Sequence, residues 1–68
     1  MDNRIKSKWD FLIQCRPDVK GIIENVKLIG GHIDYNDNHE QIFNLITTKG
    51  TFSYNERRDE FKSKFQIR

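Results

Sequence analysis

The sequence predicts an α+β domain in which one or two N-terminal helices pack on a four-stranded antiparallel β-meander. Two observations support this fold class. Residues 2–16 place apolar side chains at helical spacing. Residues 28–67 hold short runs rich in β-branched and aromatic residues, which are separated by glycine or by polar turn residues. A chain of 68 residues is long enough for one small domain, so we expect a single domain over residues 1–68.

The first helix is expected to begin at Asp2 or Asn3, because either side chain can cap free backbone N–H groups. The residue before a proline avoids the α region, so this helix should end near Cys15 or Arg16, ahead of Pro17. Apolar residues at the i, i+4, i+7 and i+8 positions predict one buried stripe along it. The stripe comprises Ile5, Trp9, Leu12 and Ile13.

A second helix is predicted from Pro17, a favoured first helical residue, to about Glu24. The alternation that follows indicates a strand beginning near Lys27. The pair Gly30-Gly31 inside this strand predicts a bulge or a place where another part of the backbone comes close.

The polar residues 36–39 predict a turn whose side chains bond to their own backbone. The next strand, residues 40–48, carries apolar side chains on both faces, which is typical of a central strand. Lys49-Gly50 predicts a tight return into a strand that ends near residue 55, and the charged residues 55–59 predict a loop. Residues 61–67 fit a last strand or a helix, and we favour the strand because the loop brings it back beside its predecessor.

Charge and composition limit the possible classes of protein. Twelve basic and ten acidic residues give a net charge of +2, which is too balanced to predict a nucleic-acid or membrane partner. One cysteine excludes an intramolecular disulfide, and neither a signal peptide nor a membrane-spanning run is evident. These features predict a cytoplasmic protein. Because a chain this short buries a small core, we also expect it to form a homodimer.

The chain contains no alanine and is rich in isoleucine, lysine and asparagine, a bias typical of AT-rich coding sequences. In length and style it resembles the small accessory proteins of phages or mobile elements of low-GC bacteria. That resemblance implies an inhibitor that binds and occludes a host protein, such as a defence protein. It assigns a role to no individual residue.

The first helix has more apolar groups than one stripe requires, because Phe11 falls off the stripe. An exposed aromatic residue suggests a surface that another chain buries. We therefore predict a non-enzymatic intracellular module for protein–protein interaction. Its partner-binding residues are expected to be the anchors Trp9, Phe11 and Tyr54 and the polar rim Arg57 and Arg58.

Two alternative functions remain open. The first is nucleic-acid binding by a basic stripe near the aromatic residues Tyr54 and Phe61. The stripe would comprise Lys49, Arg57, Arg58, Lys62 and Lys64. The second alternative is sequestration of an anionic, nucleotide-like ligand between protomers, with His32 or the arginines as contacts.

Catalytic and metal chemistry find little support in the sequence. His32, Asp34 and His39 form the single cluster suited to a metal, but a polar turn explains these residues as well, so we predict no metal and no cofactor. A calcium loop that starts at Asp34 fails because it has Leu45 where the glutamate ligand belongs. Cys15 lies at the end of an apolar helical stripe, which predicts a small buried residue. No enzyme activity is therefore predicted.

Overall fold

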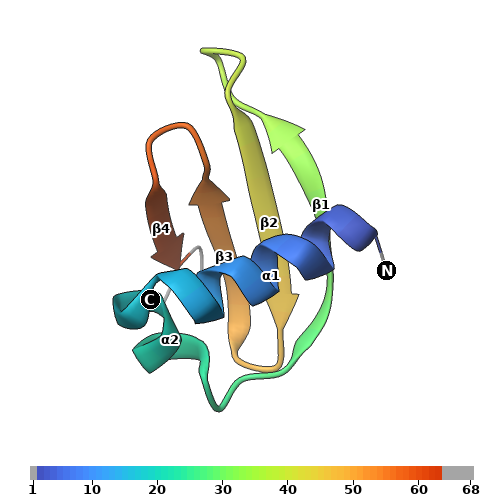
Figure 1. The fold of residues 1–68 in the computed structure, drawn as a ribbon. Helices are drawn as coiled ribbons and strands as arrows, with labels where there is room; N and C mark the ends of the chain where they lie inside the picture. The colour runs from blue at the N-terminus through green and yellow to red at the C-terminus, as the bar shows by residue number, and fades with distance from the viewer. Residues whose placement is uncertain (1, 64–68) are drawn as a thin grey trace, which may run out of the picture.

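The computed structural model describes residues 2–63, which form two helices followed by a four-stranded sheet (Figure 1). The helices are α1 (Asn3–Cys15) and α2 (Pro17–Ile23). The strands are β1 (Leu28–Tyr35), β2 (Gln41–Thr47), β3 (Gly50–Asn55) and β4 (Glu60–Ser63). Each strand pairs antiparallel with the next, in the spatial order β1-β2-β3-β4. This arrangement confirms the predicted α+β fold with its N-terminal helices and its meander.

Local signals in the sequence set the helix boundaries. The carboxylate of Asp2 caps α1 by accepting the backbone N–H of Arg4 at 2.8 Å. Arg16 has an extended backbone, with φ −124° and ψ 93°, because it precedes a proline. Pro17 then occupies the start of α2. The predicted extents of both helices are therefore confirmed to within a residue or two.

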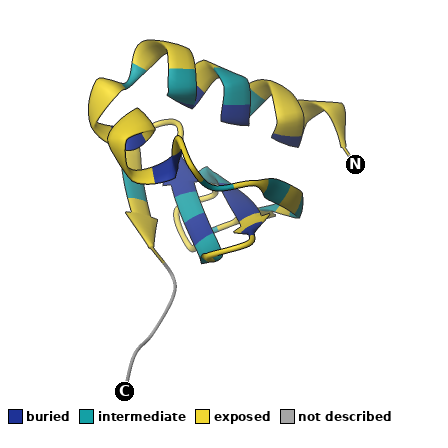
Figure 2. Cartoon of the chain, turned by 90° about the horizontal axis from the view of Figure 1, so that it is seen from below, coloured by how far each residue is buried: buried dark blue, intermediate teal, exposed yellow. Residues whose placement is uncertain are grey.

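The hydrophobic core lies between the two helices and one face of the sheet, where Figure 2 shows the buried segments. Both helices and the two central strands contribute to it, and α1 does so through the predicted stripe. The buried core residues are Ile5, Trp9, Leu12, Val19, Ile23, Phe43, Leu45, Phe52 and Tyr54.

Strand register decides which face of the sheet each side chain occupies. Phe43 pairs with Tyr54 and Leu45 with Phe52, so these four side chains share the face that the helices cover. The alternate residues of β2, Ile42, Asn44 and Ile46, point to the opposite face, where Ile46 is 38% exposed. Strand β2 is thus central and apolar on both faces, as the sequence predicted. None of the described elements covers the second face of the sheet.

Gly31 lies where α1 crosses β1. The β1–β2 register shifts between Leu28 and Gly30, which is the expected bulge. A Cβ atom on Gly31 would overlap the backbone oxygen of Asn44 and lie 3.0 Å from the side chain of Ile5. The close approach predicted from the glycine pair is therefore confirmed.

The turn between β1 and β2 is held by its own polar groups. The backbone N–H of Asn36 donates to the carbonyl of Glu40 at 3.1 Å, and the N–H of His39 donates to the carbonyl of Asn36 at 2.9 Å. His39 has a φ of 63°, in the position of a G1 bulge that glycine usually fills. The amide oxygen of Asn36 also accepts the N–H groups of Asn38 and Glu40 at 2.9 Å each, which confirms the predicted polar turn.

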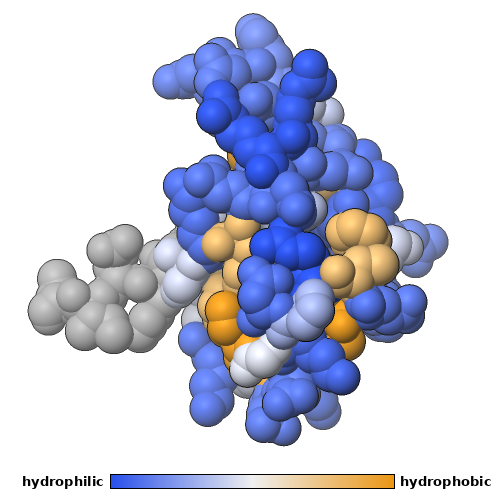
Figure 3. Space-filling model, turned by 60° about the vertical axis from the view of Figure 1, so that its left-hand side comes forward, coloured by the Kyte–Doolittle hydropathy of each residue, from blue (hydrophilic) through white to orange (hydrophobic). Residues whose placement is uncertain are grey.

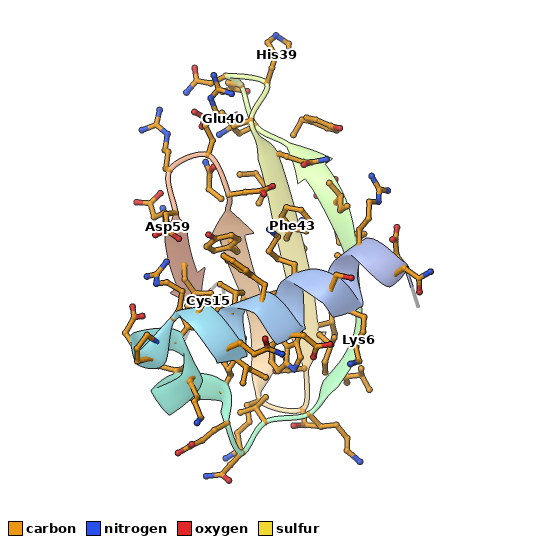
Figure 4. All side chains as sticks on the ribbon, viewed as in Figure 1. Lys6, Cys15, His39, Glu40, Phe43 and Asp59 are labelled. Atoms are coloured by element: carbon orange, nitrogen blue, oxygen red, sulfur yellow. The ribbon has the colours of Figure 1, made fainter. Side chains whose placement is uncertain are left out.

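Two features differ from the prediction or extend past the described residues. Cys15 is exposed, so the prediction that it is buried was wrong. The helical period places it roughly 90° from the centre of the α1 stripe, at the last residue of the helix (Figure 4). The last predicted strand is present as β4, but its continuation to Ile67 lies outside the described residues. Within residues 2–63, no helix is long and apolar enough to cross a membrane.

Candidate functional site

Helix α1 crosses one half of the sheet and leaves uncovered the end that carries the β1–β2 and β3–β4 turns (Figure 1). Two hollows of about 480 and 490 Å³ adjoin there, because Gln41 and Glu56 line both of them. We call the two hollows together the α1 groove. It is lined by Asn3, Arg4, Ser7, Lys8 and Phe11 of α1, by Tyr35, His39, Glu40, Gln41 and Phe43 of the β1–β2 hairpin, and by Glu56 and Arg57 of the β3–β4 turn.

Lys8 ties the helical wall of the groove to the sheet. Its ammonium nitrogen lies 3.1 Å from a carboxylate oxygen of Glu56. The same nitrogen lies over the rings of Phe11, Phe43 and Tyr54, at 4.7, 5.1 and 5.7 Å from their centroids. The side chain is only 14% exposed. A partly desolvated ammonium group gains from both the carboxylate and the aromatic faces, so Lys8 is held in place.

Phe11 stands at the rim of the groove and is 42% exposed. Its neighbours on α1, Trp9 and Leu12, point into the core. The helical period therefore turns the ring of Phe11 away from the core, as the sequence predicted. The ring is supported from beneath by the ammonium group of Lys8.

Arg57 supplies the uncompensated charge of the groove. Its backbone N–H donates to the amide oxygen of Asn55 at 3.0 Å, which fixes its place in the turn. Within residues 2–63 its guanidinium group forms no ion pair, whereas the side chain of Arg4 pairs with Asp2 at 3.3 Å and Lys8 pairs with Glu56. The side chain of Arg57 is exposed, so its guanidinium group can donate hydrogen bonds to an anionic group.

Glu40 joins the two turns that bound the groove, and Figure 4 marks its position. Its carboxylate accepts the side-chain N–H groups of Asn36, Asn55 and Arg58 at 2.9, 3.0 and 3.0 Å. These hydrogen bonds, and the charge of Arg58, lower the pKa of Glu40 to about 2. The β1–β2 and β3–β4 turns are therefore cross-linked at this end of the sheet.

A second polar cluster attaches the β3–β4 turn to the helices. The hydroxyl of Tyr54 donates to the carboxylate of Asp59 at 2.5 Å, and the guanidinium of Arg16 contacts the same carboxylate while it pairs with Asp18 at 2.9 Å. Burial and the neighbouring carboxylate of Asp59 raise the pKa of Tyr54 to about 12. The turn that carries Glu56 and Arg57 is thereby held against the junction between α1 and α2.

The five residues that the sequence predicted as partner contacts lie in different environments in the structure. Trp9 is 6% exposed and Tyr54 is 2% exposed, so the prediction that they act as surface anchors was wrong. Their large rings are part of the hydrophobic core. Phe11 and Arg57 both line the groove. Arg58 instead pairs with Glu40 and faces a neighbouring polar hollow.

The predicted basic stripe does not form as one surface. Lys49 lies in the β2–β3 turn, at the opposite end of the sheet from Arg57 and Arg58 in the β3–β4 turn (Figure 1). Lys62 lies on β4, with Glu60 at 3.8 Å, and Lys64 lies outside the described residues. On the side seen in Figure 3, the end with the turns is hydrophilic and apolar groups gather in separate patches lower down. These positions do not favour a continuous path for a nucleic-acid strand.

His32, Asp34 and His39, the residues of the sequence best suited to a metal, are not brought together around one point. His32 contacts Asp34 at 3.1 Å on the uncovered face of β1, and Asp34 also accepts the side-chain amide of Asn44 at 3.0 Å. His39 stands at the tip of the β1–β2 hairpin and points away from the sheet (Figure 4). Among residues 2–63, no three His, Cys, Asp or Glu residues are placed to hold a metal ion.

Sequence reasoning missed Lys8, Gln41 and Glu56 as parts of the site. Lys8 had one local signal, because a residue three positions before Phe11 on a helix lies beside it. Glu56 had none, since its contact with Lys8 joins residues 48 positions apart.

Comparisons with known proteins add no relative from which a function could be transferred. No protein-family model, no curated protein and no solved structure matches the chain.

Proposed function

We propose that this chain is a non-enzymatic interaction module that binds an acidic segment of another protein in the α1 groove and thereby occludes that segment. One observation carries the proposal. An exposed aromatic ring, Phe11, lines one hollow of the α1 groove, and Arg57, whose guanidinium has no ion pair among residues 2–63, lines the adjoining hollow. Aromatic and arginine side chains are the groups that supply most of the binding free energy in protein interfaces.

The apolar part of the groove suits an aliphatic or aromatic side chain of the partner. Phe11 and Phe43 line the same hollow, and the ammonium group of Lys8 lies over both of their rings. A partner side chain packed on Phe11 would bury the exposed part of a ring that is already held by Lys8. Little side-chain entropy would be lost on binding, because the ring is positioned before the partner arrives.

The charge of the groove selects an acidic partner. Glu56 and Glu40 are paired with Lys8 and Arg58, so their charges are compensated within the chain. The remaining charge at the groove is the positive guanidinium of Arg57. A carboxylate of the partner can accept two parallel hydrogen bonds from that group. A segment that carries a carboxylate a few residues from an apolar side chain therefore fits both features.

Polar contacts within the chain hold the groove in place before a partner arrives, so the module does not need to fold on binding. The cluster around Glu40 and the contact between Arg16 and Asp59 fix the turn that carries Arg57. The contact between Lys8 and Glu56 fixes the helical wall against that turn. These polar links hold the groove open at its two sides. Binding of a short extended segment then requires ordering of that segment only.

A random-peptide display library tests the proposal, with the purified chain as the immobilised target. We expect the enriched peptides to combine Asp or Glu with a nearby aliphatic or aromatic residue. Binding of the enriched peptides is then measured by fluorescence polarisation. Phe11→Ser and Arg57→Glu should each weaken it at least tenfold, the loss expected for an interface hot spot.

Two variants outside the groove serve as matched controls. Ile22→Ser removes an exposed apolar side chain of α2, and Lys20→Glu reverses an exposed charge of the same helix. Both should bind the selected peptides as the unaltered chain does. The proposal is wrong if the enriched peptides lack acidic residues, or if they bind the Phe11→Ser and Arg57→Glu variants as tightly as the controls.

A further inference from the structure

Strand β1 is an edge of the sheet, and among the described residues no strand pairs with its outer side. It has eight residues and is the longest of the four strands. Its sequence contains neither the proline nor the lysine that often prevents an edge from pairing with another chain. The edge is therefore open to a further strand.

The hairpin hydrogen bonds show which backbone groups point outward. The N–H of Asn36 donates to the carbonyl of Glu40, so Asn36 directs its backbone toward β2. In an antiparallel pair this direction alternates along the strand. The backbone groups of Asp34 and His32 therefore bond to β2. The backbone N–H and C=O groups of Gly31, Ile33 and Tyr35 point to the open edge.

We propose that two copies of this chain pair through the β1 edge, antiparallel, about a two-fold axis that passes at Ile33. In this register Ile33 faces Ile33 of the second copy, and Gly31 faces Tyr35. In each of these pairs the backbone N–H and C=O groups of both residues point to the shared edge. The two residues can therefore exchange both N–H to C=O hydrogen bonds. The two four-stranded sheets would then join into one continuous sheet.

Hydrogen-bond complementarity selects this register. His32 and Asp34 are exposed on the same face of β1, where their side chains already contact each other at 3.1 Å. A two-fold axis at Ile33 places His32 of each copy opposite Asp34 of the other. Moving the two-fold axis by one residue, to His32 or to Asp34, would place histidine opposite histidine or aspartate opposite aspartate. His32 of one copy and Asp34 of the other form a non-hydrogen-bonded pair, the type of antiparallel pair in which facing side chains lie closest together.

The same register gives Tyr35 a place to pack. This side chain is 65% exposed and lies on the face of the sheet that the helices cover. In the pair it faces Gly31, which has no side chain to compete for the space. Because Ile5 of α1 lies over Gly31, the tyrosine ring would rest against the first turn of α1 of the second copy.

Sedimentation of charge variants tests the pairing. The interface is at the small end of the range for protein pairs, so we expect the dimer to populate at roughly 10–500 μM. His32→Asp places aspartates opposite each other at both cross-copy contacts and should weaken dimerisation roughly tenfold. The double exchange His32→Asp/Asp34→His again places a histidine opposite an aspartate at both contacts between the copies. It should therefore restore the dimer. Lys20→Gln on α2 makes the same change in net charge as His32→Asp with a neutral histidine, so it is the control and should leave dimerisation unaltered.

Amide NMR signals distinguish edge pairing from packing of the open sheet faces. On raising the protein concentration, we expect the amide signals of Gly31, Ile33 and Tyr35 to move and their hydrogen exchange to slow. Those of His32 and Asp34 should keep their protection, because they bond to β2 in both states. A chain that remains monomeric throughout this concentration range, or a His32→Asp variant that dimerises as well as the unaltered chain, overturns the proposal. The peptide assay with Phe11 and Arg57 variants is independent of these outcomes.

Discussion

The carboxylate of Glu56 in the β3–β4 turn holds the ammonium group of Lys8 on α1 at 3.1 Å, across 48 positions of the sequence. Three aromatic rings surround the same ammonium group. This contact fixes the distance between the two sides of the α1 groove. The shape of the candidate site therefore depends in part on a long-range ion pair whose lysine side chain is 14% exposed and whose glutamate side chain is 52% exposed.

We expect the Lys8–Glu56 pair to stabilise the fold more than an exposed pair does. In a double-mutant cycle with Lys8→Met and Glu56→Gln, measured by urea unfolding, the coupling free energy should be about 1 kcal/mol. The Lys6–Asp10 pair on the solvent side of α1 is the matched control, with a coupling of about 0.3 kcal/mol. Equal couplings for the two pairs would contradict a special role for Lys8.

Acid should destabilise the fold through Glu40. Its pKa falls from an ordinary value of 4.5 to about 2 in the folded chain, because Asn36, Asn55 and Arg58 bond to its charged form. A group whose pKa is depressed by folding contributes stability above its unfolded pKa, and that contribution is lost as the pH falls through the folded pKa.

The melting temperature of the unaltered chain should therefore drop as the pH is lowered from 4.5 to about 2. The Glu40→Gln variant should have a lower melting temperature at neutral pH and a shallower drop in that window. Glu24→Gln on the exposed end of α2 is the control and should follow the unaltered chain. A Glu40→Gln profile parallel to that of the unaltered chain would show that these hydrogen bonds do not hold the turns together.

The two adjacent glycines of β1 should respond differently to alanine. A Cβ atom at position 31 overlaps the backbone oxygen of Asn44, whereas a Cβ at position 30 has no atom within 4 Å. We expect Gly31→Ala to lower the free energy of unfolding by about 2 kcal/mol, because the backbone of β2 must move. Gly30→Ala should change it by less than about 0.5 kcal/mol. Chemical denaturation of both variants gives the comparison, and similar losses would contradict the close approach at Gly31.

His39 offers a position where a substitution should stabilise the protein. Its φ of 63° is in the left-handed region, which costs a residue with a Cβ atom free energy that glycine does not lose. We expect His39→Gly to raise the free energy of unfolding by about 0.5 kcal/mol. Asp37→Gly, in the same turn but without a positive φ, should lower it instead. Thermal unfolding monitored by circular dichroism measures both changes, and a destabilised His39→Gly variant would contradict this account of the turn.

Local chemistry in the sequence determined the order and the extents of the elements. Asp2 and Pro17 fix the helix boundaries through one cap and one steric restriction, and both act within a few residues. Gly50, with a φ of 114°, permits the tight return between β2 and β3. Apolar side chains on both faces of β2 were enough to identify a central strand of the sheet.

Only the tertiary structure decided which side chains remain on the surface. The helical period placed Trp9 on the stripe and Phe11 off it, but only the packing of distant segments shows that Trp9 and Tyr54 are buried too deeply to contact a partner. The distribution of charge was equally hidden, since Lys49 and Arg57 are near in the chain but lie at opposite ends of the sheet. Helix caps and turns depend on neighbours in the sequence, whereas burial and ion pairing depend on how distant segments pack together, so sequence patterns encode the first and not the second.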